Sequence, residues 1–206
     1  MSSHHFVKEQ QEPAVLILNT EGFSFDSISP LLEWVPTVLV AETCVEQVLT
    51  WVIKIDVILA SQEFQQKNLQ LLEEQYPLKF YASSPQESLE NALHYLLASA
   101  HQAVHLVGFP HEKALELSLF LEKMDLTILE PGWKFYPVKN GAFKKWLPET
   151  ILEIFGKENL PLEIENSNGK IILPLTYITR IEVPEGFTSI QSSELFWVGE
   201  PLISSK

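Results

Sequence analysis

The sequence predicts an α/β fold: a doubly wound, mostly parallel sheet with helices on both faces, followed by a smaller β-rich C-terminal domain. Three observations predict it. Apolar runs of strand length recur from residue 14 to residue 129, helical patterns lie between them, and short β-like runs follow Pro131. The expected organisation is a flexible lead-in at 1–13, an α/β domain at 14–140 and a β-rich domain at 141–206.

Six continuous apolar runs predict the strands of the α/β domain. Because each run is apolar on both faces, it is typical of a parallel strand that is buried from both sides. Repeated alternation of such strands with helices implies right-handed crossover connections. The runs occupy residues 14–19, 37–41, 55–60, 78–81, 103–107 and 126–129.

The segments between these runs carry helix signals. Ser29 before Pro30 predicts a helix start, and Thr43 with Glu46 and Ser84 with Glu87 have the spacing of capping boxes. The helix after Ser84 has the clearest apolar stripe, and residues 64–75 and 111–124 are further helix candidates. The stripe consists of Leu89, Ala92, Leu93, Leu96, Leu97 and Ala100.

Beyond Pro131 the pattern favours antiparallel β structure. Residues 133–138 have β character, 148–155 read as a short helix, and Asn168-Gly169 is a strong hairpin signal. Further apolar runs lie at 160–164, 170–176, 177–183 and 194–198.

Composition excludes several classes of function. The 206 residues carry a formal charge of −13, which disfavours nucleic-acid binding because phosphate backbones are also negative. No apolar run is long enough for a membrane span, and the chain start has no apolar signal core, so we expect a cytoplasmic protein. Cys44 is the only cysteine, which rules out a disulfide or a cysteine-based zinc site within one chain; we expect a small apolar filler rather than a nucleophile.

Common catalytic motifs are missing. The eight glycines form neither a dinucleotide fingerprint nor a P-loop, and no nucleophile elbow occurs. His94 and His101 are seven residues apart and should share one helix face, as a polar stripe rather than a metal pair. His111 lies just beyond an apolar strand, where we expect it to cap the next helix rather than enter a ligand crevice.

Residues 131–148 form a local positive island. They contain four lysines, five aromatic residues and no acid. Such a stretch can meet a phosphate, stack a planar ring or receive an acidic partner. The alternative is a hairpin whose aromatic side chains close the core and whose lysines face water.

Five segments together resemble the thiamine pyrophosphokinase family. The strand 38–41 leads into Glu42, the strand 55–59 leads into Ser61 and Glu63, and residues 81–93 run through Glu87 and Ser88 into a helix. His105-Leu106-Val107-Gly108 is similar to the family's strand ending in glycine, and Ile171-Ile172-Leu173-Pro174-Leu175 looks like a strand of its β domain. The resemblance implies an α/β domain joined to a β-sandwich, a homodimer, and transfer of diphosphate from ATP to thiamine with magnesium.

The resemblance also implies where ligands bind. The candidate ligand-binding residues are Glu42, Ser61, Glu63, Glu87, Ser88, Gly108 and Lys113. The family's magnesium and phosphate motifs have changed at several of these places: Ser61, Pro85 and Ser88 stand where aspartates are expected, and Lys113 stands where an arginine is expected. Because glutamate is one methylene longer than aspartate, Glu42 and Glu63 are not simple replacements. We therefore assign no metal ligand and no catalytic residue.

Three functions follow, in order of preference. The first is a catalytically impaired or altered relative that binds a small ligand, thiamine or a nucleotide, or a partner at the strand ends. The second is an active kinase using Mg²⁺ and ATP, with metal ligands moved to Glu42, Glu63, Glu87 and Glu116. The third is a non-enzymatic dimeric scaffold that uses residues 131–148 for contact.

Overall fold

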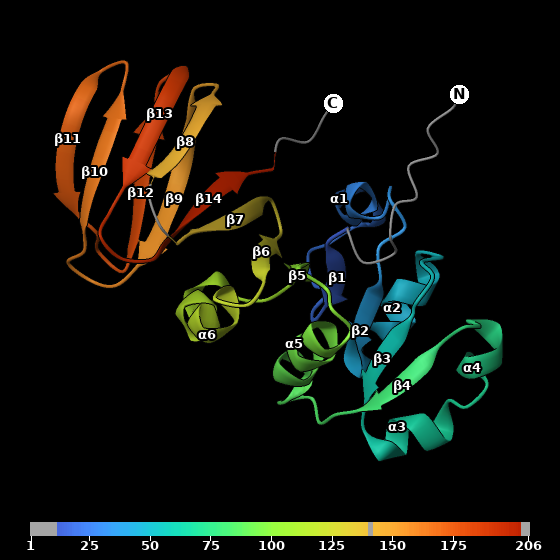
Figure 1. The fold of residues 1–206 in the computed structure, drawn as a ribbon. Helices are drawn as coiled ribbons and strands as arrows, with labels where there is room; N and C mark the ends of the chain where they lie inside the picture. The colour runs from blue at the N-terminus through green and yellow to red at the C-terminus, as the bar shows by residue number, and fades with distance from the viewer. Residues whose placement is uncertain (1–11, 140–141, 203–206) are drawn as a thin grey trace, which may run out of the picture. The chain divides into compact units, whose positions relative to one another are not determined.

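The structure, a computed structural model, describes residues 12–139 and 142–202. The chain forms two compact units (Figure 1). Unit 1 contains the described residues up to Phe109 together with Glu122–Leu126, and unit 2 contains Pro110–Leu121 and the described residues from Thr127 onward. The domain boundaries expected from the sequence, 14–140 and 141–206, stay a prediction.

Unit 1 is built on a parallel sheet with the strand order β5-β1-β2-β3-β4. Five of the six predicted apolar runs are confirmed as its strands, whereas the sixth, 126–129, lies in β6 (Asp125–Glu130), which pairs antiparallel with β7 (Trp133–Val138). All four residues in each of β1, β2 and β3 are buried, whereas β4, at the edge of the sheet, is partly exposed. The strands are β1 Ala14–Ile17, β2 Val38–Ala41, β3 Val57–Ala60, β4 Lys79–Ala82 and β5 Ala103–Val107.

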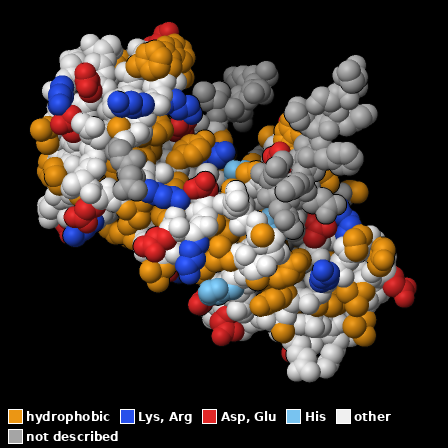
Figure 2. Space-filling model, in the orientation of Figure 1, with side chains coloured by type: hydrophobic (Ala, Val, Ile, Leu, Met, Phe, Trp, Pro, Cys, Tyr) orange, Lys and Arg blue, Asp and Glu red, His pale blue; other side chains and the backbone are white. Residues whose placement is uncertain are grey.

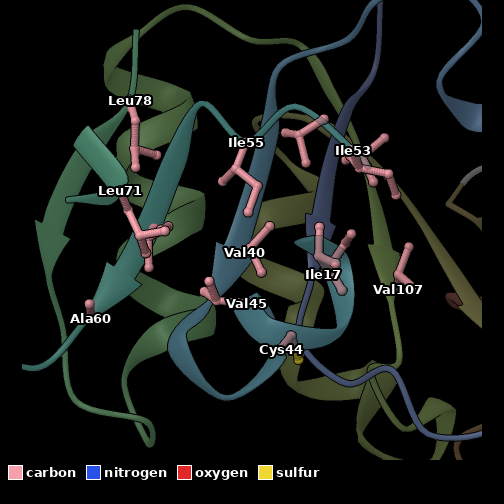
Figure 3. Packing of buried hydrophobic residues seen from close by; sticks show 14 of the residues in the cluster. Ile17, Val40, Cys44, Val45, Ile53, Ile55, Ala60, Leu71, Leu78 and Val107 are labelled. Atoms are coloured by element: carbon pink, nitrogen blue, oxygen red, sulfur yellow. The ribbon is translucent and has the colours of Figure 1, made fainter. Parts of the chain in front are cut away.

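Short helices connect these strands. They are α1 Phe25–Ile28, α2 Val45–Thr50, α3 Gln62–Lys67, α4 Leu71–Glu74 and α5 Ser88–Ala98, with 3₁₀ turns η1 Ser29–Leu31 and η2 Glu42–Cys44. One apolar cluster joins Ile17 and Val40 of the sheet to Val45 of α2 and Leu71 of α4, with Cys44 beneath them (Figure 3). This packing fixes the carboxyl ends of the strands, after which the candidate ligand-binding residues Glu42, Ser61 and Gly108 lie.

The predicted helix starts are wrong in detail. Ser29 lies inside η1, Thr43 lies in η2 before α2, and α5 begins at Ser88, after the predicted cap Ser84. The reason is local: η1 extends α1 instead of opening a new helix, η2 occupies the start of the segment before α2, and a turn at residues 85–87 precedes α5. Capping patterns alone do not distinguish these short turns from the start of an α-helix. The candidate at 64–75 divides into α3 and α4.

Unit 2 is dominated by antiparallel β structure. Its connecting segment from Pro110 forms η3 His111–Leu117 and α6 Ser118–Leu121, where one helix at 111–124 was predicted. Five of its strands are neighbours in the order β12-β9-β14-β7-β6, and a separate four-stranded sheet has the order β11-β10-β13-β8. The strands are β6 Asp125–Glu130, β7 Trp133–Val138, β8 Ala142–Leu147, β9 Thr150–Gly156, β10 Pro161–Asn166, β11 Gly169–Pro174, β12 Ile178–Val183, β13 Gly186–Gln191 and β14 Phe196–Pro201.

A buried cluster between the strands of unit 2 forms its core. It includes Leu152 and Ile154 of β9, Leu162 of β10, Ile190 of β13 and Val198 of β14. The predicted hairpin at Asn168-Gly169 is confirmed by the pairing of β10 with β11. The mixed α/β part with a parallel sheet and the β-rich C-terminal part are thus both present.

Two β-rich predictions are corrected. Residues 148–155 are not a helix: β9 pairs with β12 and β14, and its apolar residues fill the core between them. Residues 131–148 are not a hairpin either, because β7 pairs with β6 and β14 while β8 pairs with β13 in the other sheet. Strands β8 and β13 were not predicted because lysines interrupt the apolar residues of β8, and uncharged polar residues interrupt those of β13.

No helix within residues 12–139 and 142–202 has the length and apolar character needed to cross a bilayer. On the face drawn in Figure 2, acidic, basic and hydrophobic side chains are interspersed over both units. Although the formal net charge is −13, the acidic side chains on this face therefore do not form a single patch.

Candidate functional site

Glu42 and Ser61 meet at the carboxyl edge of the unit 1 sheet. Glu42 directly follows β2 and Ser61 directly follows β3, and these strands are parallel neighbours. Glu42 Oε2 accepts two hydrogen bonds from Ser61: one from the backbone N at 2.7 Å and one from Oγ at 2.8 Å. The carboxylate that the resemblance places at a ligand site is therefore held by the end of the next strand.

Ser61 has a second role as the N-cap of α3. Its Oγ accepts a hydrogen bond from the backbone N of Phe64 at 3.3 Å, which satisfies one of the free amides of the first helical turn. One hydroxyl thus connects the Glu42 carboxylate to the helix that follows β3. The result is a continuous hydrogen-bonded link from β2 to α3.

Glu63 lies on the exposed side of α3. Its carboxylate pairs with Lys67 one helical turn later, with Oε1 2.6 Å from Nζ, and both side chains are largely exposed. The hydrogen bond from Lys67 and its charge hold the pKa of Glu63 below its ordinary value. Glu63 therefore makes an ordinary i, i+4 surface pair in this structure.

Glu87 and Ser88 lie in the turn between β4 and α5. Ser84 Oγ donates to Glu87 Oε2 at 2.6 Å, and Ser88 Oγ donates to the backbone O of Ser84 at 3.0 Å. Asn91 Nδ2 donates to Ser83 Oγ at 3.0 Å from the first turn of the helix. Hydroxyl and amide groups thus build the turn where the resemblance predicts several aspartates.

Gly108 ends β5 beside the end of β1. Its φ of +74° is in the left-handed region, and a Cβ at this position would lie 2.3 Å from the backbone O of Asn19. Only glycine allows so close an approach, and Leu18 N donates to Val107 O at 2.9 Å in the same place. Asn19 therefore joins the predicted residues at this edge, together with Thr20, which contacts Cys44.

Cys44 lies in the apolar core below this edge. It is 2% exposed, and burial raises the pKa of its thiol above the ordinary value although Thr43 and Thr20 hydrogen bonds oppose the shift. A buried thiol with a raised pKa is a poor nucleophile because little thiolate forms near neutral pH. This placement agrees with the predicted role as a small apolar filler.

Lys113 and His111 lie in unit 2, on η3. The Lys113 side chain is exposed, and so is that of Glu116 one turn later. Pro110, rather than His111, is the N-cap of η3, so the predicted capping role of His111 is wrong. His111 is instead buried, because its ring packs against Phe135.

His94 and His101 were predicted to share one helix face, and this prediction is wrong. The helix α5 ends at Ala98, and the chain leaves it through Ala100 at a φ of +63°. His101 is 6% exposed and bonds Ser99 Oγ through Nδ1 and Thr37 Oγ1 through Nε2. His101 therefore fastens the end of α5 to the start of β2.

The basic and aromatic stretch 131–148 is divided between β7 and β8. Lys134 and Lys145 both lie over the ring of Tyr136, with Nζ 5.2 and 5.8 Å from its centroid. Lys145 also pairs with Glu200, and burial together with the nearby Glu200 charge raises the pKa of Tyr136 to about 12. Both lysines therefore contact groups of unit 2, although the Lys145 side chain is still 46% exposed to water.

The edge around Glu42 offers hydrogen-bonding groups and no free cation among the described side chains named above. Its accessible groups are the Ser61 and Ser84 hydroxyls, the Asn19 and Asn91 amides, and the Glu42 and Glu87 carboxylates, each of which accepts a hydrogen bond from a serine; the Ser88 hydroxyl is buried. The described lysines of unit 1 are Lys54, Lys67, Lys79 and Lys123. Lys67 pairs with Glu63, and Lys54 donates to backbone oxygens including Ile55 O. Such an edge can bind polar neutral groups but supplies little charge for a polyphosphate.

Within residues 12–139 and 142–202, one group of three potential metal ligands has its ligand atoms within 4.8 Å of one another. It consists of His111, Glu112 and Glu130 in unit 2. Glu42, Glu63 and Glu87 do not form such a group in the described part of the chain.

No protein-family model and no curated protein matches the sequence. The structure, however, is similar to solved thiamin pyrophosphokinases. The enzyme from Geobacillus thermodenitrificans gives a TM-score of 0.68 at 10% identity, over 93% of this chain and 99% of that chain. The enzyme from Bacillus subtilis gives 0.62 at 11% identity, over 91% and 97% of the two chains. The yeast enzyme gives 0.58 at 9% identity, over 93% and 87%. The chain therefore has the fold of the thiamin pyrophosphokinases, the family that its sequence resembles.

Proposed function

We propose that this protein is a thiamine pyrophosphokinase-like protein that does not transfer diphosphate and that binds a small ligand at the carboxyl edge of its parallel sheet. The observation that carries the proposal is the double hydrogen bond from Ser61 to Glu42 Oε2. These two hydrogen bonds occupy one oxygen of the Glu42 carboxylate, which lies where the resemblance predicts a cation-binding acid.

Diphosphate transfer from ATP depends on magnesium, which bridges phosphate oxygens and offsets their charge. Mg²⁺ requires oxygen ligands at about 2.0–2.1 Å in a near-octahedral arrangement. To recruit Glu42 Oε2, the ion would have to compete with two hydrogen bonds and disturb the cap of α3 at Ser61. Ser61 itself offers a neutral hydroxyl in place of a second carboxylate.

The chemistry of the edge favours a neutral or cationic ligand over a polyphosphate. Hydroxyl and amide side chains line the strand ends, and the nearby Lys67 is already paired with Glu63. The chain's charge of −13 adds a further unfavourable field for ATP. Thiamine, which is a cation, is therefore the preferred ligand of this proposal, ahead of a nucleotide.

The active-kinase alternative requires Glu42, Glu63, Glu87 and Glu116 to act as relocated metal ligands. In the structure, the first three bond to Ser61, Lys67 and Ser84 respectively. Under this alternative, Glu63→Gln would abolish turnover. Under our proposal the same change removes one surface ion pair and leaves ligand binding intact.

The proposal includes the predicted arrangement with helices on both faces of the sheet. The complete burial of β1, β2 and β3 supports it, since both side-chain directions of these strands are covered. It also includes a cytoplasmic homodimer. The dimer is supported by the exposed aromatic pair Trp146 and Phe187, which lie opposite each other on β8 and β13.

The proposal is tested by titration calorimetry with thiamine, thiamine diphosphate, ATP and AMP, each with and without Mg²⁺. We expect thiamine to bind with an affinity that Mg²⁺ does not change, and ATP to bind more weakly. Glu87→Gln, which removes an exposed charge at this edge, should weaken binding of the cationic thiamine, while Ser27→Ala, on α1, should not. Failure of all four compounds to bind, or tight binding of ATP that needs Mg²⁺, would contradict the proposal.

A further inference from the structure

One imidazole in unit 2 is enclosed by carboxylates from three elements. His111 is the first residue of η3 and is 8% exposed. Its Nδ1 lies 2.9 Å from Oε2 of Glu130 on β6 and 3.7 Å from Oε2 of Glu112. Its Nε2 lies 2.9 Å from Oε1 of Glu153 on β9. All four residues belong to unit 2, so the cluster does not depend on unit 1.

The cluster has more negative than positive charge. Three carboxylates face His111, and the only guanidinium beside them is that of Arg180, whose Nε donates to Glu153 Oε2 at 2.7 Å. Burial opposes a charged imidazole, but the hydrogen bond and charge of Glu130 and the charges of Glu112 and Glu153 outweigh it and raise the pKa of His111. With the ring neutral, the carboxylates exceed the cations by two, which is the charge of a divalent ion.

We propose that His111 Nδ1, Glu130 Oε2 and Glu112 Oε2 bind one zinc ion, which takes the place of the ring proton between His111 and Glu130. In a tetrahedral zinc site with metal–ligand distances of about 2.0–2.2 Å, neighbouring ligand atoms are about 3.3–3.5 Å apart. The two observed separations, 2.9 and 3.7 Å, lie on either side of this value. The third separation, between the Glu112 and Glu130 ligand atoms, is within 4.8 Å. Side-chain rotations that bring all three separations to this value admit the ion.

The surrounding contacts orient these ligands. The backbone N of His111 donates to Glu130 Oε1 at 2.7 Å, so the same carboxylate is fixed through its second oxygen. The His111 ring stacks on Phe135, with centroids 4.4 Å apart and an angle of 7°. Glu153, 3% exposed, faces the other ring nitrogen, although at an angle that does not make a hydrogen bond. A carboxylate facing the second nitrogen is the usual arrangement behind a metal-bound histidine.

The ligand types select the ion. One imidazole and two carboxylates suit Zn²⁺, with water in the fourth position, whereas Mg²⁺ prefers oxygen ligands alone. The Glu112 side chain is 49% exposed, which leaves a path from solvent to the site. Tyr177 Oη donates to the backbone O of Glu112 at 3.2 Å and holds this residue beside the ring.

The test is titration calorimetry of the full chain with Zn²⁺, and with Mg²⁺ as a comparison, at about pH 8, where protons compete less for the imidazole. All proteins carry His4→Ala and His5→Ala, so that the N-terminal histidine pair cannot bind the metal. We expect about one Zn²⁺ per chain and no comparable Mg²⁺ binding. Glu112→Gln should weaken Zn²⁺ binding at least tenfold, while Glu116→Gln, an exposed change on the same η3 segment, should not.

Stability measurements keep the proposal separate from misfolding. Glu112 makes only a 3.7 Å contact with the ring, so Glu112→Gln should leave the metal-free melting temperature nearly unchanged. Zn²⁺ should raise the melting temperature of the parent protein and of Glu116→Gln but not that of Glu112→Gln. Absence of Zn²⁺ binding in the parent protein, or equal binding by Glu112→Gln, would overturn the proposal and leave the cluster a structural ion pair.

Discussion

Ser61 donates both its backbone N–H and its hydroxyl to one oxygen of Glu42, across the carboxyl ends of β2 and β3. The two residues are 19 positions apart in the chain and are brought together by the parallel register of the strands. This link joins two strand ends and caps α3 at the same time. It gives a structural role to the carboxylate at the place where the resemblance to thiamine pyrophosphokinases predicts a cation-binding acid.

Ser61→Ala should lower the free energy of unfolding by about 2 kcal/mol, because it removes a helix cap and a hydrogen bond to a carboxylate. Ser61→Asn, which keeps a capping side chain without a negative charge, should cost less. Urea denaturation of the three proteins measures the difference. Equal stability of Ser61→Ala and the parent protein would show that the link contributes nothing.

Ser61→Asp should create a cation site beside Glu42. Aspartate is a good cap, but its charge faces Glu42 without compensation, so the variant should be less stable than the parent in the absence of metal. Mg²⁺ should then raise the melting temperature of Ser61→Asp and leave Ser61→Asn and the parent unchanged. A thermal-shift series with Mg²⁺ checks this. A response of the parent equal to that of Ser61→Asp would contradict the assigned role of the link.

Gly108→Ala should be strongly destabilising because the new Cβ would meet Asn19 O at 2.3 Å while φ is +74°. Gly132→Ala is the matched control, since Gly132 has a φ of +80° and no atom within 4 Å of the added Cβ. Both changes add backbone strain, but only the first adds overlap, which typically costs about 1–3 kcal/mol more. Urea denaturation separates the two, and equal losses would refute the close approach of β5 and β1.

His101 should make stability depend on pH below neutrality. Burial lowers the pKa of His101 from its ordinary value, although a backbone hydrogen bond with Leu96 opposes this. The folded state therefore favours the neutral ring. Its stabilising contribution is present above the unfolded-state pKa of about 6.5 and is lost as pH falls through the lower folded-state pKa.

Urea denaturation between about pH 7.5 and 5 tests this dependence. The parent protein should lose more stability over this range than His101→Gln, which keeps a polar side chain that does not titrate. His94→Gln is the control, because His94 lies on the exposed side of α5. Parallel curves for the parent and His101→Gln would show that the buried ring does not titrate differently in the folded state.

The proposed homodimer should depend on the aromatic pair of unit 2. Trp146 and Phe187 lie opposite each other in the four-stranded sheet and are 50% and 76% exposed. Burial of such aromatic surface stabilises many interfaces. Replacing both with threonine should convert a particle of twice the chain mass into a single chain, as measured by light scattering, while Leu119→Gln on α6 should not. A parent protein that is already a single chain would contradict the dimer.

The strands of unit 1 could be predicted because β1, β2 and β3 are buried on both faces and therefore read as continuous apolar runs. Residues 148–155 were misread as a helix because proline and glycine at the ends of a segment are compatible with either element. Pairing with β12 and β14 decides for a strand, and such pairing is not visible in a local pattern.

The candidate site, like the fold, could be predicted from the sequence only in part. Glu42, Ser61 and Gly108 could be located because each follows a recognisable strand. Their bonding could not be predicted, since it depends on which strand lies beside which. The importance of Glu130 and Glu153 was likewise hidden, because both lie inside β-strands far in sequence from His111. Only the folded chain brings these carboxylates around one imidazole.

The most direct test of the central claim is release of AMP from ATP in the presence of thiamine and Mg²⁺, with an established thiamine pyrophosphokinase measured alongside. We expect the purified protein to release no more AMP than a sample without protein, at any Mg²⁺ concentration, while still binding thiamine. Magnesium-dependent AMP release at a rate comparable to that of the reference enzyme, lost in Glu63→Gln, would contradict the account and establish the relocated-glutamate kinase.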